Sequence, residues 1–395
     1  MKILSTTLCY PTPANPSQGV FVRRRLEAIA RLADVRVVCP VPYFPGWSDR
    51  HPDDVPDALP PVEYARMFYL PGVLKTFDAT FLSLALRHRL RALRRTFRFD
   101  LLDAHFVWPD GVGAAAVAWK LGVPIVVTVR GKIVSQARHV LRRRRILAML
   151  RSVDGRVAVS NAMSQRVHDL AGADLDLRVI PNGVDTDVFQ PADAAIARQA
   201  LGLDPEPRYI VSVGQVREIK GFDRLIEVLP EVRRRAGDVR LVLVGPAIGE
   251  TGYERRVHRL IERHDLHEVV SLVGPKNPRA VAEFLAAADV FALATRSEGW
   301  CNAIHEALSV GTPVVTTDVG GNRELVTSDR LGLLVPFGEP AALANALVRA
   351  LERTWDRAAI SVVGQQRSWD QAAAETVDYF DQILSRQPKS ERTAP

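Results

Sequence analysis

The chain has 395 residues, more than a single hydrophobic core usually organises, so two domains are expected. Its hydrophobic content of 47% and charged content of 25% are ordinary for a globular protein, and no apolar run reaches the roughly 18 residues that predict a transmembrane helix. The three cysteines are widely spaced, which excludes a disulfide scaffold and a cysteine metal site and is typical of a cytoplasmic protein.

Apolar runs typical of strands alternate with segments of helical spacing along the first half of the chain. The run at residues 2–8 is predicted to be a first strand rather than a signal peptide, and residues 19–33 are predicted to form a helix. Repeated prolines prevent residues 42–75 from forming one regular element. Further strands are predicted at residues 35–41, 101–107, 124–129, 153–160 and 177–180.

A second alternating set follows a break at residues 181–207, which includes a short predicted helix near 194–201. Its strands are predicted at residues 209–214, 239–245, 269–274, 289–295, 312–317 and 331–336. Such alternation is typical of parallel doubly wound sheets. The predicted fold class is therefore α/β, with two Rossmann-like domains whose parallel sheets face an interdomain cleft.

The domain boundaries are predicted from the break and from the last helical pattern. An N-terminal domain is expected at residues 1–188 and a C-terminal domain at 189–366, with a hinge near 185–206. An amphipathic helix within residues 367–386 is expected to cross back to the first domain. Residues 387–395 are expected to be a disordered tail.

Charge is distributed unevenly along the chain. Residues 1–190 carry 27 Lys and Arg against 17 Asp and Glu, whereas residues 191–395 carry 25 against 28. The basic stretch 137–151 could lie on an anionic membrane surface with Val140, Leu141 and Leu147 partly inserted. A solvated arginine face explains the same residues, and both interpretations stay open.

Two carboxylates and a basic loop in the second half favour binding of a phosphorylated, hydroxylated ligand. Glu298 and Glu306 are separated by a glycine-containing loop and the start of a predicted helix, so that Glu306 shares a helix face with Asn302. Lys220 begins a helix after a strand and Gly214, where the helix dipole favours a bound anion beside it. Taken singly, each residue is also compatible with an ordinary surface position.

Other motifs exclude several classes of enzyme. The segment 111–116 matches the dinucleotide-binding pattern, but the ribose-binding acid expected about twenty residues later is missing. The phosphate loop of nucleotide triphosphatases, the nucleophile elbow and metal-ligand spacings are absent from the sequence. No metal and no cofactor are therefore predicted. His105 ends an apolar strand, where it is either a structural residue or a site residue.

Several segments together resemble glycosyltransferase family 4, the retaining nucleotide-sugar glycosyltransferases of the GT-B fold. The Glu298–Glu306 motif, VGQVREIKG, VIPNGVDTDVFQP, DAHFVWPDG and PIVVTVRGK are each similar to family segments. The opening YPTPANPSQGVFVRRRL is similar to members that build bacterial cell-surface polysaccharides, including teichuronic-acid-type enzymes. The resemblance covers nearly the whole chain.

The resemblance implies roles for matching residues. It implies a catalytic group formed by His105, Arg217, Lys220 and Glu298. It implies a donor site formed by Gly19, Gly214, Arg217, Lys220, Gly299, Trp300, Cys301, Asn302, Ala303 and Glu306. Arg130, Lys132 and Asn161 are placed on the acceptor side.

Two positions depart from the family pattern. Gln215 stands where the family often has arginine, and Arg217 is the candidate substitute. Arg130 and Gly131 begin a segment that in the family often reads histidine-glycine-x-aspartate, which points to a phosphorylated or anionic acceptor.

The predicted function is transfer of a sugar, with retention and without a metal, from a nucleotide-diphosphate sugar to a hydroxyl acceptor in cell-surface polysaccharide or glycolipid synthesis. The expected partners are the donor, a sugar, glycolipid or polysaccharide acceptor and, as an open alternative, the inner face of the plasma membrane; nucleic acid is not expected. A nucleotide-sugar 2-epimerase and a non-catalytic anion-binding or nucleic-acid-binding protein remain alternative interpretations.

Overall fold

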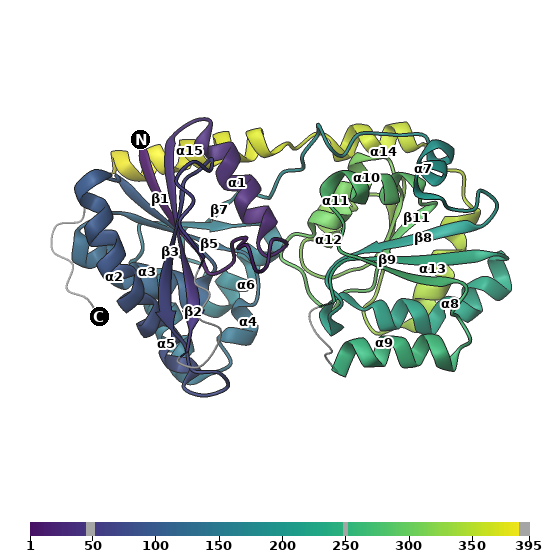
Figure 1. Ribbon diagram of the computed structural model, residues 1–395, viewed down its shortest axis with the longest axis horizontal. Coiled ribbons are helices and arrows are strands. Elements are labelled where there is room, and N and C mark those ends of the chain that lie inside the picture. Colours follow the sequence, from purple (N-terminus) through teal and green to yellow (C-terminus); the bar gives the residue numbers. More distant parts are fainter. Residues whose placement is uncertain (45–51, 248–251, 387–395) are drawn as a thin grey trace. The chain divides into compact units, whose positions relative to one another are not determined.

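The computed structural model describes residues 1–44, 52–247 and 252–386, so the predicted disordered tail at 387–395 lies outside the described residues. The chain divides into two compact units, each with a central sheet and flanking helices (Figure 1). The first unit comprises Met1–Gly183 together with the chain from Trp369 onward, and the second comprises Val184–Ser368. No helix in the described ranges is long and apolar enough to cross a membrane.

The first unit is built on a seven-stranded parallel sheet with the order β3-β2-β1-β4-β5-β6-β7. Its strands are β1 (Lys2–Thr6), β2 (Asp34–Tyr43), β3 (Val62–Phe68), β4 (Leu101–His105), β5 (Ile125–Val129), β6 (Gly155–Ala158) and β7 (Arg178–Val179). Register pairs Ser5 with Asp103 and His105 with Thr128, so polar side chains meet near the carboxyl ends of β1, β4 and β5.

Helices cover both faces of this sheet. They are α1 (Val20–Ala30), η1 (Lys75–Phe77), α2 (Asp78–Thr96), η2 (Val107–Gly111), α3 (Val112–Leu121), α4 (Ile133–Gln136), α5 (Val140–Ser152), α6 (Asn161–Ala171) and α15 (Trp369–Ser385). Leu4 packs in the core with α2, α3 and α5, whereas Ile3 packs in the core with α1 and α15, because successive strand side chains point to opposite faces.

A buried arginine ties the last helix to the first unit. The Arg25 side chain is 1% exposed and donates hydrogen bonds to Thr376 Oγ1 of α15 at 2.8 Å and to the carbonyl oxygen of Ile180 at 3.4 Å. Arg25 therefore joins α1, α15 and the segment that follows β7.

Strand β3 was not predicted from the sequence. It lies between Pro61 and Pro71, within the proline-rich segment that cannot form one regular element. The prolines flank the strand rather than interrupt it, and β3 pairs with β2 through Val37 and Val62. Short strands between prolines are thus compatible with the sequence, although their pairing partner is not readable from it.

The second unit contains a six-stranded parallel sheet with the order β10-β9-β8-β11-β12-β13. Its strands are β8 (Arg208–Val213), β9 (Val239–Val244), β10 (Val270–Gly274), β11 (Val290–Leu293), β12 (Val314–Thr317) and β13 (Gly332–Val335). Its helices are α7 (Ala194–Leu201), η3 (Glu218–Lys220), α8 (Phe222–Ala236), α9 (Gly252–Arg263), α10 (Pro278–Ala287), α11 (Asn302–Ser309), α12 (Asn322–Leu325), α13 (Pro340–Glu352) and α14 (Arg357–Gly364). The predicted α/β class with two Rossmann-like parallel sheets is confirmed.

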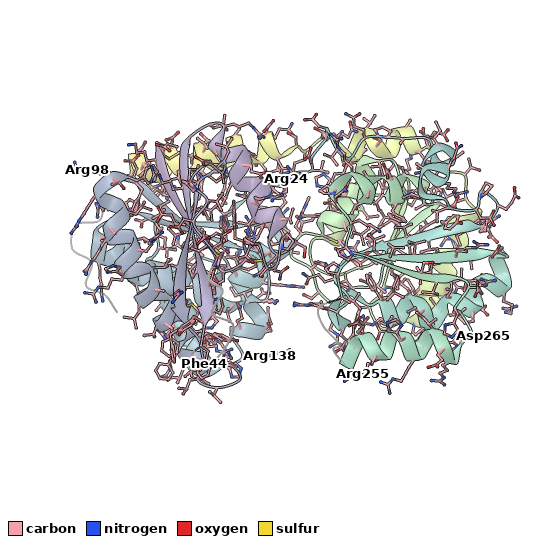
Figure 2. The ribbon with its side chains drawn as sticks, viewed as in Figure 1. Arg24, Phe44, Arg98, Arg138, Arg255 and Asp265 are labelled. Carbon is pink, nitrogen blue, oxygen red and sulfur yellow. The ribbon has the colours of Figure 1, made fainter. Side chains whose placement is uncertain are left out.

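Long charged side chains lie at the surface of each unit. Figure 2 labels Arg98 and Arg138 on the first unit and Arg255 and Asp265 on the second, and all four are exposed. The apolar side chains of the strands form the two buried cores instead. Each unit therefore has its own hydrophobic interior, as expected for a domain.

Candidate active site

Three loops of the second unit follow the carboxyl ends of neighbouring strands β8, β11 and β12. Two glycines allow these loops to touch through their backbones. A Cβ atom added to Gly221 would lie 2.0 Å from the carbonyl oxygen of Ala294, and one added to Gly320 would lie 1.9 Å from that of Glu298. Both glycines have positive φ angles, a backbone conformation that residues with a side chain rarely adopt. The sequence thus brings three loops together where parallel sheets commonly bind ligands.

Lys220 and Glu298 form an ion pair between two of these loops. The Nζ of Lys220 lies 2.7 Å from Oε1 of Glu298, and the two side chains are 24% and 12% exposed. Thr295 Oγ1 lies 3.1 Å from the same carboxylate oxygen and 2.8 Å from the carbonyl oxygen of Ile219. The single hydroxyl proton of Thr295 is therefore shared between one acceptor on each of the two loops that carry the pair.

Lys220 stays protonated, and therefore positively charged, at neutral pH. Burial by itself lowers the pKa of Lys220, but the Glu298 carboxylate raises it, as does Glu306, so the pKa lies above its usual value. Burial raises the pKa of the Cys301 thiol to about 12, so this cysteine is neutral. These loops therefore carry a partly buried cation beside a carboxylate.

Helix α11 begins at Asn302 and presents Glu306 on its partly exposed side. Ile304 and Leu308 are buried on the opposite side, at 0% and 1% exposure. Asn302 and Glu306 are one helical turn apart and both partly exposed. Since the charge of Glu306 contributes to the raised pKa of Lys220, the two groups lie close enough to interact.

The remaining predicted donor residues surround this pair in different ways. Arg217 is exposed, and its side chain has no hydrogen-bond or ion-pair partner within the described ranges. A Cβ added to Gly214 would lie 3.4 Å from Cγ of Lys220. The ring of Trp300 packs edge to face on His305 at 5.8 Å. Gly299 is buried and Ala303 is half-buried beside them.

His105 is enclosed in the first unit rather than exposed. Its side chain has no exposed surface, and its Nε2 lies 3.1 Å from both Ser5 Oγ and Asp103 Oδ2. Arg130 Nη2 lies 3.1 Å from Nδ1. Because a guanidinium only donates, Nδ1 accepts and Nε2 carries the proton. Burial lowers the pKa of His105, Asp103 opposes this and Arg130 adds to it, so the ring is neutral.

The predicted acceptor-side residues differ in exposure. Arg130 is 7% exposed, donates to Asn182 Oδ1 at 3.0 Å and lies over the Phe21 ring. Lys132 is exposed just before α4, and Asn161 is the first residue of α6. The predicted site residues thus form two groups, one in each unit.

Gly19 and Asp110 organise the loop between β1 and α1. A Cβ added to Gly19 would lie 2.0 Å from the carbonyl oxygen of Cys9, so only glycine fits there. Asp110 Oδ1 accepts a hydrogen bond from the backbone N–H of Leu8 at 2.6 Å. Burial raises the pKa of Asp110 to about 7.

Some residues that shape the site were not predicted. Thr295 and Asn322 have no motif of their own, yet Asn322 Nδ2 donates to the carbonyl oxygen of Thr317 at 2.9 Å and so supports the turn that holds Gly320. Among the described residues, no group of three or more His, Cys, Asp or Glu is arranged to hold a metal ion.

Two family models match the chain. The one described as "Glycosyltransferase Family 4" matches residues 18–188, and "Glycosyl transferases group 1" matches residues 193–367. The D-inositol 3-phosphate glycosyltransferase of Xylanimonas cellulosilytica is 31% identical over 81% of this chain and 79% of its own length. The putative teichuronic acid biosynthesis glycosyltransferase TuaC of Bacillus subtilis is 29% identical over 88% and 89%.

Solved structures share the fold at lower identity. Sucrose-phosphate synthase from Thermosynechococcus elongatus has a TM-score of 0.80 at 20% identity and covers 98% of this chain and 99% of its own. Anabaena Alr3699/HepE in complex with UDP and glucose has a TM-score of 0.74 at 24% identity, with 97% and 100% covered. Sheet topology, site and relatives together define a glycosyltransferase with the GT-B fold. The chain belongs to glycosyltransferase family 4. The epimerase alternative is not favoured, because both relatives are glycosyltransferases.

Proposed function

We propose that the protein transfers a sugar from a nucleoside-diphosphate sugar to a hydroxyl of a sugar, glycolipid or polysaccharide acceptor, with retention of the anomeric configuration. The observation that carries this proposal is the partly buried Lys220–Glu298 pair, with Glu306 nearby, at the carboxyl ends of β8 and β11. The description of Alr3699/HepE as a complex with UDP and glucose supports a UDP-sugar as the donor to try first.

In this proposal Lys220 neutralises the diphosphate of the donor. A charge-assisted hydrogen bond from its ammonium to a phosphate oxygen would stabilise the leaving group as negative charge develops. Arg217 adds a second cation, because its exposed side chain is not committed to any described partner. With these two cations supplied by the protein, we propose that the transfer needs no metal ion.

The two glutamates would bind hydroxyl groups of the donor. Oε1 of Glu298 is engaged by Lys220 and Thr295, which fixes the carboxylate. Its Oε2 has no hydrogen-bond partner in the described parts of the chain and is available for hydroxyls of the transferred sugar. Glu306, on the partly exposed side of α11, would accept hydrogen bonds from the ribose.

We assign His105 to positioning. Its ring is enclosed between Asp103 and Arg130, so in this arrangement it orients Arg130 at the end of β5 instead of exchanging protons with substrate. The acceptor hydroxyl would attack from the face that the diphosphate leaves, and a departing phosphate oxygen would take its proton. Catalysis then consists of positioning and electrostatic stabilisation.

Helix α5 supports a proposed contact with an anionic membrane. Val140 and Leu141 are 66% and 59% exposed, next to exposed Arg143 and Arg144. Arg145 donates to the carbonyl oxygen of Thr76 at 3.1 Å, which fixes α5 to the segment before α2. Vesicle sedimentation tests this contact: more protein should pellet with anionic than with neutral lipid, and equal pelleting would leave α5 as a solvated face.

A thermal-shift panel of nucleoside diphosphates tests the proposed function first, since the correct base should raise the unfolding midpoint most. The corresponding sugar donor is then incubated with and without acceptor. Product should form only with acceptor, and its NMR spectrum should show the anomeric configuration of the donor. Conversion of the donor alone would favour an epimerase, and an inverted product would exclude the retaining mechanism.

A further inference from the structure

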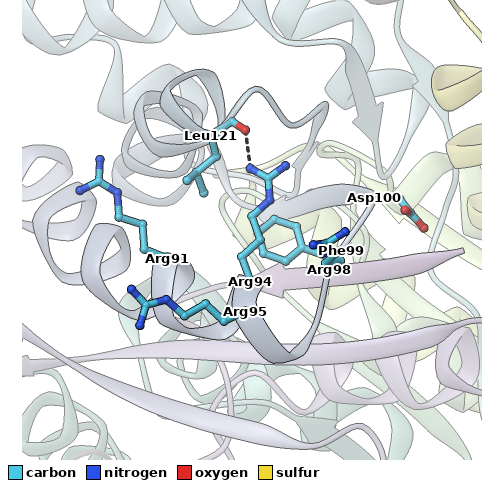
Figure 3. Close-up of a pocket in the computed structure, with 7 residues that line it drawn as sticks. All are labelled: Arg91, Arg94, Arg95, Arg98, Phe99, Asp100 and Leu121. Atoms are coloured by element: carbon cyan, nitrogen blue, oxygen red, sulfur yellow. Dashed lines mark hydrogen bonds between the residues drawn. The ribbon is translucent and has the colours of Figure 1, made fainter.

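A surface depression of the first unit lies at the end of α2. It has a volume of about 790 Å³. Its lining consists of Arg91, Arg94, Arg95, Arg98, Phe99, Asp100 and Leu121. In Figure 3, Arg91 and Arg95 extend to the same side from successive turns of α2. Four arginines and one carboxylate around a single hollow predict an anionic ligand.

The depression lies at the amino edge of the first sheet. Asp100 immediately precedes β4, whereas His105 ends it, so the strand separates the two places by roughly 16 Å at about 3.3 Å per residue. The Asp100 carboxylate already has a partner, because its Oδ2 accepts a hydrogen bond from the backbone N–H of Lys2 at 2.7 Å. The depression is therefore distinct from the cluster around His105.

Within the part of the chain that the structure describes, Arg94 alone among the four arginines has a hydrogen-bond partner. The Arg94 guanidinium donates to the carbonyl oxygen of Leu121 and lies 6.0 Å from the centre of the Phe99 ring. Arg91, Arg95 and Arg98 are exposed and have no carboxylate partner within residues 1–44, 52–247 and 252–386. Three guanidinium charges are thus left unpaired around one hollow.

Helix α8 shows what an ordinary arginine-rich helix end looks like in the same chain. Its last turn contains Arg233, Arg234 and Arg235, and each is within reach of a carboxylate, at 3.7 Å from Asp238, 2.8 Å from Glu231 and 3.8 Å from Glu231 respectively. Attraction to the helix dipole explains arginines at both helix ends. It does not explain why those at the end of α2 lack counter-charges.

We propose that this depression binds a phosphate group, carried either by a soluble molecule or by a lipid headgroup. Guanidinium groups bind phosphate oxygens through paired hydrogen bonds, which suits several arginines around one ligand. The carboxyl end of α2 opposes an anion with about half a negative charge, which three unpaired guanidinium groups outweigh. The site belongs to the first unit and the proposed donor site to the second, and the proposal does not depend on the donor site.

The test compares the wild-type chain with an Arg91→Gln, Arg95→Gln, Arg98→Gln triple variant. The control is an Arg263→Gln, Arg330→Gln, Arg349→Gln triple variant, which removes three exposed arginines of the second unit. Sodium pyrophosphate is titrated by calorimetry, and vesicles of phosphatidylglycerol or phosphatidylcholine are sedimented. Equal thermal midpoints and equal transfer activity confirm that all three proteins are folded. If the α2 triple variant is not folded, a single Arg95→Gln variant replaces it.

Any contribution of the donor site to pyrophosphate binding is common to the three proteins. At least tenfold weaker pyrophosphate binding in the α2 variant alone would assign a soluble ligand. Loss of phosphatidylglycerol binding alone, with pyrophosphate unaffected, would assign a headgroup. If the α2 variant matches the wild-type protein in both assays, or if the control variant loses as much, the proposal is wrong.

Discussion

Lys220 keeps its charge although it is partly buried, because the carboxylates of Glu298 and Glu306 outweigh the effect of burial on its pKa. An ion pair of this kind stabilises the fold little, since desolvation of both groups offsets most of their attraction. Its value lies in a fixed cation that needs little rearrangement when an anion arrives.

Glu306 provides a prediction about donor binding. Glu306→Gln should weaken binding of the preferred nucleoside diphosphate about tenfold, because a charge-assisted hydrogen bond contributes about 1.5 kcal/mol or more. Calorimetry measures the affinity, with Glu352→Gln as a control, since Glu352 is exposed on the last turn of α13. An unchanged dissociation constant would remove Glu306 from the ribose site.

Asp110 provides a prediction about pH. Burial raises the pKa of Asp110 to about 7 from an ordinary value near 4, so the folded state binds a proton that the unfolded state has lost. The group therefore favours folding below about pH 4 and loses this contribution as the pH rises to about 7.

Asp110→Asn should abolish that part of the pH dependence while keeping an acceptor for the N–H of Leu8. Urea unfolding between pH 4 and 8 measures it through the midpoint. Parallel pH profiles of variant and wild-type protein would show that Asp110 is ionised in both states.

The sequence indicated Lys220, Glu298 and Glu306 because each stands at a recognisable position after a strand or on a helix face. It did not indicate that Lys220 pairs with Glu298 or that His105 is enclosed by Arg130, because these contacts join residues distant in the chain. Thr295 and Asn322 were missed for the same reason: their hydrogen bonds depend on which loops meet.

At the scale of elements, Gly221 joins η3 to α8 where no side chain fits. Gly221→Ala should destabilise the protein by more than the 1–3 kcal/mol of backbone strain, because its Cβ would overlap the carbonyl oxygen of Ala294. Displacement of η3 should also move Lys220 and weaken donor binding.

Gly202→Ala is the matched control for this substitution. Gly202 has a similar positive φ of 65° after α7, but nothing lies within 4 Å of its added Cβ. It should therefore lower the unfolding midpoint modestly and leave donor affinity unchanged. Equal effects of the two substitutions on affinity would show that contact between the loops does not position Lys220.

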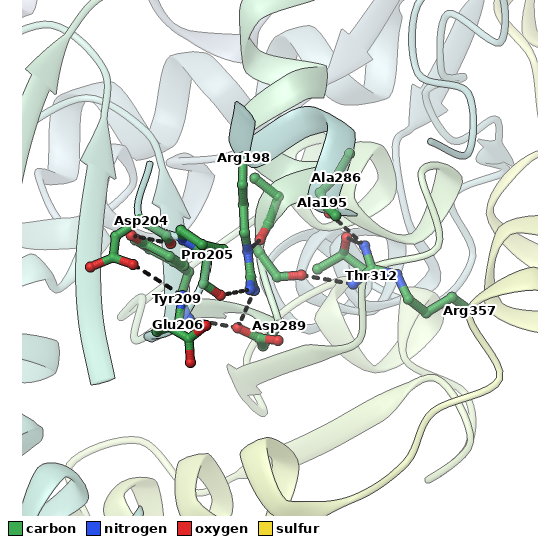
Figure 4. A network of polar contacts seen from close by, with 12 residues as sticks. Ala195, Arg198, Asp204, Pro205, Glu206, Tyr209, Ala286, Asp289, Thr312 and Arg357 are labelled. Atoms are coloured by element: carbon green, nitrogen blue, oxygen red, sulfur yellow. Dashed lines mark hydrogen bonds and ion pairs between the residues drawn. The ribbon is translucent and has the colours of Figure 1, made fainter. Parts of the chain in front are cut away.

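Arginines fix the amino edge of the second sheet, opposite to the candidate site (Figure 4). Arg198 of α7 donates a hydrogen bond at 2.7 Å to Oδ2 of Asp289, the residue just before β11. Arg357 donates to the carbonyl oxygen of Ala288 at 2.7 Å and to Thr312 Oγ1 at 2.8 Å. These contacts hold α7 and α14 to the sheet.

Most strands were predictable because alternation of apolar runs and helical spacing is a local signal. The short helix predicted near 194–201 coincides with α7. Strand β3 was not predictable, since its flanking prolines dominate the local pattern and its pairing with β2 depends on distant residues. Several strand ends differ from the predicted ranges by one or more residues: β1 ends at Thr6, inside its predicted range, whereas β2 extends to Tyr43, beyond its predicted range.

At the scale of the whole molecule, the first unit is formed by an N-terminal and a C-terminal segment of the chain. Packing places α15 with Met1–Gly183, and the second unit is a continuous insertion at Val184–Ser368. The first and last residues of the second unit lie side by side, because Val184 and Ser368 form an isolated parallel β-bridge. We propose that this continuous unit binds the donor and that the other unit, richer in arginine, binds an acceptor that carries negative charge.

The most direct measurement is the turnover number of Lys220→Ala with the preferred sugar donor and acceptor, beside Lys276→Ala, which removes an exposed lysine of the same unit. Removal of one preorganised donor to the leaving group should lower kcat by about 10²- to 10³-fold, while Lys276→Ala keeps the wild-type rate. A folded Lys220→Ala protein that turns over at the wild-type rate would contradict the assignment of the Lys220–Glu298 pair as the centre of the active site.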